Sequence, residues 1–361
     1  MQSQTDLESP HLLSGTTLMD RTEVLSPFLP GTNIMYAWDS TCLGLFKTCP
    51  RLYQYVIIDG WGSNEESIHL RFGIEYHQAL QEYDISRASG IPHDDAVFDT
   101  VKALHARVWD WEVDEDSKAG HYKNKRSLVR TVCDYLDHFK KDPATTYILE
   151  DGRPAVELSF RFELDWGPRL QPQKVIVQEI GFQRGLGRVE EDINVENPTI
   201  QPYLLSGHLD RVVDYQGALY VMDRKTTTTT PGAYYFNQFE PNNQMSLYTI
   251  AGKLVLDSPV KGVIIDAAQI LIDSSRFVRG FTMRTPDQLE EWTDDLAYHL
   301  SIAESYATEG YWPMNDTACD KFGGCRFREI CSKSPNVREQ FLKGRFTKQA
   351  PEDRWNPLKP R

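Results

Sequence analysis

The sequence predicts an α/β fold, because helix-like and strand-like patterns are mixed along one chain. Residues 69–86 read as a helix, and residues 154–166 alternate between apolar and polar side chains as a strand does. Two further strand-like runs, 207–213 and 218–223, flank the turn-like segment 214–217. We therefore expect a sheet flanked by helices.

The remaining elements follow in chain order. Residues 40–57 have helical spacing that Pro50 must interrupt, and Thr285 opens a late helix with a capping box and Pro286 at its first position. The other predicted elements are helices at about 94–112 and 123–141, a helix after Pro241, and strands at 262–272 and 276–283.

The domain organisation follows from where polar, aperiodic sequence gives way to globular composition. Residues 1–32 are polar, so we expect a flexible arm there. We expect one domain over 33–335, with a helical insertion at about 87–150 and a cysteine cluster at 319–331, and then a tail at 336–361.

Composition and charge exclude several classes of protein. Hydrophobic residues make up 40% and aromatic residues 11% of the 361, which excludes a wholly disordered chain. The 39 basic and 52 acidic residues give a net charge of −13, which argues against a protein coated in basic charge. No apolar run is long enough to span a membrane and no secretory signal is present, so we expect a cytoplasmic protein with reduced thiols.

Two carboxylates and a lysine converge in the predicted hairpin. If residues 207–213 pair with 218–223, Asp210 lies opposite Val221, and Asp223 is its diagonal neighbour on the same face. Lys225 shares that face. Such a set suits metal-assisted phosphodiester hydrolysis, with the carboxylates holding magnesium or manganese. A surface salt bridge on a hairpin is the alternative.

Three of the six cysteines, Cys319, Cys325 and Cys331, lie within thirteen residues, and Cys49 lies in a Cys-Pro-Arg-Leu-Tyr context far upstream. The spacing does not match the usual paired zinc ligands. Three clustered thiolates with one distant partner can hold a four-iron cluster. Free cysteines in a loop are the alternative, with Cys42 a competitor for Cys49 and Cys133 read as a core residue.

The combination of Gly-His-Leu-Asp-Arg (207–211) and Asp-Arg-Lys-Thr (223–226) resembles the core of the PD-(D/E)XK nuclease superfamily, and more narrowly its RecB-type branch. The resemblance implies the restriction-endonuclease-like mixed sheet. It implies metal binding by His77, Asp210 and Asp223, catalysis by Lys225, and substrate-side or supporting roles for Gln244 and Tyr248. Glu157 occupies a place where that branch often has a glutamate, although an exposed strand edge explains it as well.

The same branch has members with one cysteine before the nuclease core and three after it, among them exonuclease V, AddB and CRISPR-adaptation exonucleases. The resemblance implies a structural 4Fe–4S cluster on Cys49, Cys319, Cys325 and Cys331. Here the first downstream spacing is longer than the usual one.

We expect a divalent-metal-dependent DNA nuclease without membrane association. The resemblance alone implies that it is an exonuclease on single-stranded ends, with a helicase or recombination partner. The main alternative is a non-catalytic or weakly catalytic subunit of a helicase–nuclease or CRISPR-adaptation complex; a zinc-stapled nucleic-acid binder is a third reading. Residues 121–130 are the most basic short stretch, and read either as a solvated helix face or as a phosphate-contacting patch. Trp109, Trp111 and Tyr122 are candidates for base stacking or for core packing.

Overall fold

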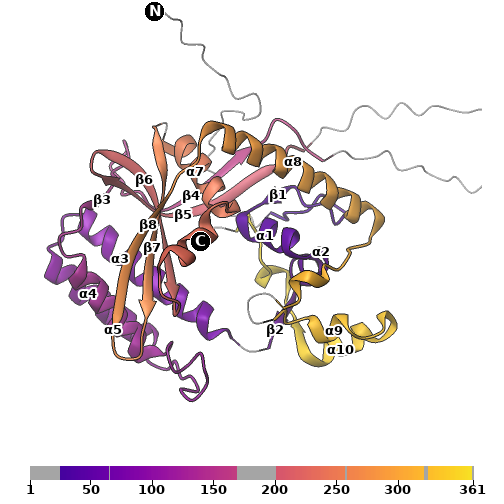
Figure 1. The fold of residues 1–361 in the computed structure, drawn as a ribbon, viewed down its shortest axis with the longest axis horizontal. Helices are drawn as coiled ribbons and strands as arrows, with labels where there is room; N and C mark the ends of the chain where they lie inside the picture. The colour runs from indigo at the N-terminus through magenta and orange to yellow at the C-terminus, as the bar shows by residue number, and fades with distance from the viewer. Residues whose placement is uncertain (1–24, 65, 169–200, 257, 321–323, 360–361) are drawn as a thin grey trace, which may run out of the picture.

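The fold is taken from a computed structural model, which describes residues 25–359 apart from residues 65, 169–200, 257 and 321–323 (Figure 1). In this part of the chain, seven strands form one sheet in the order β1-β5-β6-β7-β8, and β3 and β4 also pair with β5. The β5–β6 pair is antiparallel and the β6–β7 pair is parallel, so the predicted mixed sheet is confirmed. The strands are β1 (Ala37–Trp38), β3 (Ala144–Thr146), β4 (Val156–Glu163), β5 (Leu204–Tyr215), β6 (Ala218–Thr227), β7 (Val260–Ile270) and β8 (Ser275–Thr282).

Helices cover both faces of this sheet (Figure 1). On one face, α3 (Ile68–Ala88), α4 (His93–Arg107) and α5 (Lys125–His138) pack together against Ala268 and Ile270 of β7. On the other face lie α1 (Ser40–Thr48), α7 (Asn243–Leu256) and α8 (Pro286–Glu309). Short helices complete the chain: α2 (Pro50–Tyr53), the π-helix η1 (Gln54–Ile58), α6 (Ala233–Phe236), η2 (Asn237–Phe239), η3 (Asp316–Ala318), α9 (Arg328–Cys331), η5 (Pro335–Val337), α10 (Arg338–Arg345) and η6 (Pro351–Asp353).

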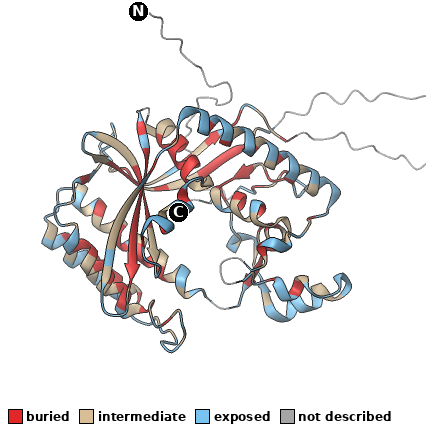
Figure 2. Cartoon of the chain, viewed as in Figure 1, coloured by how far each residue is buried: buried red, intermediate tan, exposed pale blue. Residues whose placement is uncertain are grey.

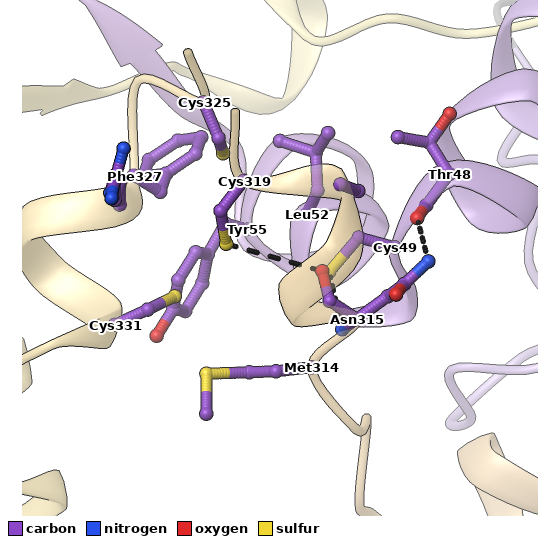
Figure 3. A pocket seen from close by; sticks show the side chains of 12 residues that line it. Thr48, Cys49, Leu52, Tyr55, Met314, Asn315, Cys319, Cys325, Phe327 and Cys331 are labelled. Atoms are coloured by element: carbon purple, nitrogen blue, oxygen red, sulfur yellow. Dashed lines mark hydrogen bonds between the residues drawn. The ribbon is translucent and has the colours of Figure 1, made fainter. Parts of the chain in front are cut away.

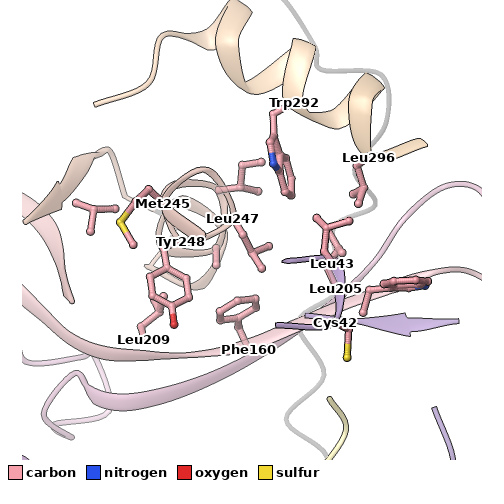
Figure 4. Close-up of a cluster of buried hydrophobic side chains, with 14 of the residues drawn as sticks. Cys42, Leu43, Phe160, Leu205, Leu209, Met245, Leu247, Tyr248, Trp292 and Leu296 are labelled. Carbon is pink, nitrogen blue, oxygen red and sulfur yellow. The ribbon is translucent and has the colours of Figure 1, made fainter. Parts of the chain in front are cut away.

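The largest hydrophobic cluster lies between the sheet and α7 (Figure 4). Phe160 of β4 and Leu209 of β5 pack against the side chains of α7, and Trp292 and Leu296 of α8 close the cluster from the other side. Buried residues follow the same layers in the whole molecule (Figure 2). This layering holds β5, β6 and α7 in fixed relation, and these are the elements that carry the candidate site.

Local signals in the sequence set several boundaries. Thr285 caps α8 with a capping box shared with Gln288, and Gly310, with φ of 66°, ends that helix. The helix over 40–57 is interrupted as expected: α1 ends at Thr48 and α2 restarts at Pro50. None of the helices within the described ranges is long and apolar enough to cross a membrane.

The predicted register of the β5–β6 hairpin is wrong by two residues. Asp214 and Tyr215 stay in the strand, and the turn is the two-residue pair Gln216-Gly217, both with positive φ. Tyr215 therefore pairs with Ala218, and continuing this register places Asp210 opposite Asp223 rather than opposite Val221. A shift of two residues leaves each side chain on its predicted face, because the side-chain period of a strand is two.

Two further predictions concern the termini and one cysteine. Within the expected arm, Leu29 is buried and Phe28 pairs with Met35. Within the expected tail, β9 (Phe346–Lys348) pairs with β2 (Trp61–Ser63) as a separate small sheet. Cys133, expected in the core, is only half-buried on α5.

Candidate active site

Asp210 and Asp223 lie where β5 and β6 diverge. Strand pairing runs from the turn to Arg211↔Met222 and is not recorded beyond it, while the far end of β5 pairs with β1 instead. At this fork the carboxylate of Asp210 accepts a hydrogen bond from the backbone N–H of Arg224 at 2.9 Å. A side chain thus satisfies the backbone donor at the fork and holds one carboxylate in place beside the other.

Lys225 connects these carboxylates to helix α7. Its Nζ lies 2.7 Å from Oδ2 and 2.9 Å from Oδ1 of Asp223, and it donates to Oε1 of Gln244 at 3.1 Å. The amide nitrogen of Gln244 in turn lies 3.0 Å from the hydroxyl of Tyr248. The Gln and Tyr share a helix face because they are four residues apart. The lysine is therefore held from two elements at once.

His77 and Glu157 complete the cluster from α3 and β4. Nδ1 of His77 lies 3.2 Å from Oδ2 of Asp210. Glu157 interrupts the β4–β5 pairing at the level of Asp210, and its φ of 49° lies in the left-handed region, which strains the strand there. Among the described residues, His77, Glu157 and Asp210 form the one group of three or more potential ligands whose ligand atoms all lie within 4.8 Å of one another.

The electrostatics of the cluster suit a bound cation. Burial raises the pKa of Asp223, and the Asp210 carboxylate raises it further against the opposing effect of Lys225. Burial would also raise the pKa of Asp210, but His77 and Lys225 outweigh it and hold that pKa well below its usual range. For His77, burial lowers the pKa, but Asp210 outweighs it and the net shift is upward.

The donor set fits a divalent metal. Oδ2 of Asp223 is buried and accepts no hydrogen bond of good geometry, so its one recorded partner is the ammonium of Lys225. Carboxylate oxygens suit magnesium and manganese, and an imidazole nitrogen suits transition metals. His77, Glu157, Asp210 and Asp223 could therefore hold such an ion between α3, β4, β5 and β6.

A buried ion pair behind the site was missed by sequence reasoning. Arg224, between Asp223 and Lys225, points to the opposite face of β6 and donates to Asp84 of α3 at 2.6 Å. Asp84 lies seven residues, two helical turns, after His77. The pair connects α3, which carries His77, to β6, which carries Asp223. The signal in the sequence was the seven-residue spacing, which puts Asp84 on the same helix face as His77.

The four cysteines expected to act together line one cavity (Figure 3). Cys49 lies between α1 and α2, and its Sγ accepts a hydrogen bond from the backbone N–H of Asn315 at 3.3 Å. Its companions are on the C-terminal segment: Cys319, Cys325 and Cys331. Cys42, the competitor for Cys49, is fully buried in the main core and hydrogen-bonded at its backbone to Asp39.

Two distant segments of the chain, 48–55 and 314–331, line the cavity. Its empty volume, open solvent included, is about 390 Å³, and its other walls include Leu52, Tyr55 and Phe327. Burial raises the pKa of the Cys319 and Cys331 thiols, and both are raised further by neighbouring cysteines of the set, among them Cys49. The structure thus brings the distant cysteine to the other three.

Comparison with known proteins places this fold. A crystal structure of a putative exonuclease from Eubacterium rectale is 9% identical to this chain, with a TM-score of 0.44. The match covers 84% of this chain and 92% of that one. No curated protein matches the chain. The family model described as the PD-(D/E)XK nuclease superfamily matches residues 40–332. The chain therefore belongs to the PD-(D/E)XK nuclease superfamily.

Proposed function

We propose that the protein is a divalent-metal-dependent DNA exonuclease of the RecB-type branch that acts on single-stranded ends. Membership in the superfamily implies nuclease activity. The observation that carries the proposal is the convergence of His77, Asp210, Asp223 and Lys225 at the fork between β5 and β6. A degenerate, non-catalytic relative would be expected to have lost at least one of these groups.

The side chains divide the work of hydrolysis. His77, Asp210 and Asp223, with Glu157 beside them, would hold the metal, which when bound lowers the pKa of a water and polarises the phosphoryl oxygen. The ammonium of Lys225 lies at the rim of this cluster, where it can orient the attacking water and offset charge that develops on the phosphate. Gln244 fixes the position of that ammonium, and Tyr248 fixes Gln244.

The shared cavity of the four cysteines supports the further proposal that they hold a structural 4Fe–4S cluster. The two alternatives are one tetrahedral zinc and a larger cluster. A single zinc with bonds of about 2.3 Å needs its sulfurs about 3.8 Å apart. No three cysteine sulfurs of the described residues lie within 4.8 Å of one another, which favours the larger group. A cluster there would join Cys49 to the segment 319–331 and staple the two ends of the nuclease core together.

The test of the function is digestion of 5′- or 3′-end-labelled linear DNA, and of unlabelled circular DNA followed by gel electrophoresis. Each is tested as single and as double strands, with magnesium or manganese. An exonuclease releases label from linear single strands in steps and leaves circular single strands intact. Cleavage of circles would show an endonuclease. If neither metal supports cleavage of any substrate, the protein is a non-catalytic subunit and the proposal fails. Loss of cleavage in an Asp223→Ala variant that is purified in the same way would exclude a contaminating nuclease.

A further inference from the structure

The basic stretch 121–130 is not one uniform patch. Lys125 forms an ion pair with Glu112 and donates to the carbonyl of Trp109. The guanidinium of Arg130 donates to carbonyls of the turn between β7 and β8, at 2.6 Å and 2.7 Å. Both cations are therefore already used in contacts within the protein. Arg126 is exposed.

Lys123 differs from its neighbours. It is 4% exposed, and its Nζ donates to the hydroxyl of Thr226 at 3.0 Å and lies 5.1 Å from the ring centroid of Phe72. No carboxylate is among its recorded contacts in the described part of the chain. Burial lowers the pKa of this lysine to about 8. A buried ammonium without a counter-ion is unfavourable in the free protein, and an anion supplied from outside would relieve that cost.

Its position is next to the candidate catalytic strand. Thr226 directly follows Lys225 in β6. Asn124, the residue after Lys123, is the N-cap of the fourteen-residue helix α5, so the positive end of that helix dipole lies beside the ammonium. The ammonium of Lys123 and the N-terminus of α5 therefore both give positive potential beside β6, the strand that carries Lys225.

A strip along one face of α3 runs from the metal cluster toward this lysine, with open space at Gly73. His69, Gly73 and His77 are spaced four residues apart and share one helix face. A Cβ added at Gly73 would meet nothing within 4 Å. The lysine lies beside this strip, because its Nζ is 5.1 Å from the ring centroid of Phe72, the residue before Gly73. Partial burial and then Lys123 lower the pKa of His69.

We propose that Lys123 binds a backbone phosphate of the substrate strand, away from the scissile bond, after the strand has crossed α3 at Gly73. The ligand class is a phosphodiester anion, and the contact is independent of base sequence. This inference rests on the proposed function, because the anion is taken to be part of the polynucleotide that the metal site cleaves.

The first test is the salt dependence of binding to a 5′-fluorescein oligothymidylate, measured by anisotropy in an Asp223→Asn background that prevents cleavage. We expect Lys123→Met to weaken binding about tenfold and to reduce the slope of log K against log salt by about 0.7, the share of one single-strand phosphate. Lys123→Arg should keep the parent slope. Arg126→Gln, an exposed cation of the same stretch, should change affinity less than twofold.

A second measurement separates binding from folding. Lys123→Met removes a buried charge and keeps the side-chain length, so its Tm should be unchanged or raised while its affinity falls. Gly73→Leu should also cut affinity, because it fills the strip, while keeping the helix, in which leucine is more favourable than glycine.

The outcomes are decisive in each direction. A lower Tm with an unchanged salt slope shows that Lys123 is structural and overturns the inference. So does an Arg126→Gln variant that loses as much affinity as Lys123→Met. If the parent cleaves DNA while Lys123→Met binds like the parent, the inference fails and the proposed function stands. If the parent neither binds nor cleaves, both fall.

Discussion

The fork site and the cysteine cavity are assembled in opposite ways. Asp210, Asp223 and Lys225 come from one hairpin, and the sheet brings them together through local pairing. Cys49 and Cys319 are 270 positions apart, and only the packing of the C-terminal segment against α2 joins them. The first region borders the main hydrophobic core, whereas the second borders a small separate cluster around Tyr55 and Phe327.

This difference indicates what each region needs from its metal. The carboxylates at the fork already have protein partners, an imidazole and an ammonium, so the fold should persist without a divalent ion. The cysteines have few recorded partners in the described residues, and a group bound there would supply folding free energy. Removing a ligand should therefore abolish chemistry in one region and stability in the other.

The largest expected effect is the loss of cleavage in Asp223→Ala. It removes a proposed metal ligand but little packing, so we expect a fall of about 10³-fold or more in rate with an unchanged Tm, the scale of losing a preorganised electrostatic group. Lys225→Ala should also lose cleavage but keep manganese binding, measured by isothermal titration. Parent-like digestion by either variant would show that the active site lies elsewhere.

Cys49→Ala should mainly lose stability, whereas Asp223→Ala should mainly lose cleavage. Closing a loop of some 270 residues implies on the order of 5 kcal/mol by chain entropy, so we expect a large fall in the free energy of unfolding. Brown colour and absorption near 400 nm should be lost with it. The matched control is Cys133→Ala on α5, which should keep both. If the two variants have the same stability and the same absorption, a metal group does not link Cys49 to the segment 319–331. A colourless parent that contains zinc would refute the iron–sulfur assignment.

His77→Ala should have a smaller effect, confined to the fork. A histidine ligand favours manganese over magnesium, so the parent should be more active with manganese. The variant should bind the metal about ten- to a hundredfold more weakly, as is typical when a residue that holds or orients a metal is removed. It should also lose the preference for manganese. Metal titrations of DNA cleavage measure both quantities. An unchanged preference for manganese would leave His77 a packing residue.

The last expected effect is a pH dependence of stability that comes from Lys123, which lies beside Thr226 of β6. The pKa of Lys123 is lowered to about 8 by burial. Between pH 8 and its unfolded value near 10.4, the unfolded chain binds the extra proton, so the stability of the parent rises with pH. The extra stability of Lys123→Met, up to about 3 kcal/mol at pH 7, should therefore vanish by about pH 10.5. Urea unfolding at both pH values measures it, and a pH-independent difference would contradict the uncompensated charge.

Much of the fold could be predicted because its signals are local. The capping box at Thr285, the break at Pro50 and the alternation in β4 each act over a few residues, and each was found where expected. The hairpin was found but its register was not, because aspartate is typical of turns. Asp214 stays in the strand here, and its side chain accepts a hydrogen bond from the backbone N–H of Gly217 in the turn. The shared face of Asp210 and Asp223 survived this error, since it depends only on odd and even spacing.

The sequence by itself determined the kinds of group that meet at the fork: two carboxylates, a lysine, and a histidine on a helix face. Tertiary structure decided how they meet. The divergence of β5 from β6, the left-handed turn of the backbone at Glu157 and the burial of Lys123 against Thr226 arise from contacts between distant segments. Such contacts depend on how layers pack, and no local pattern encodes them.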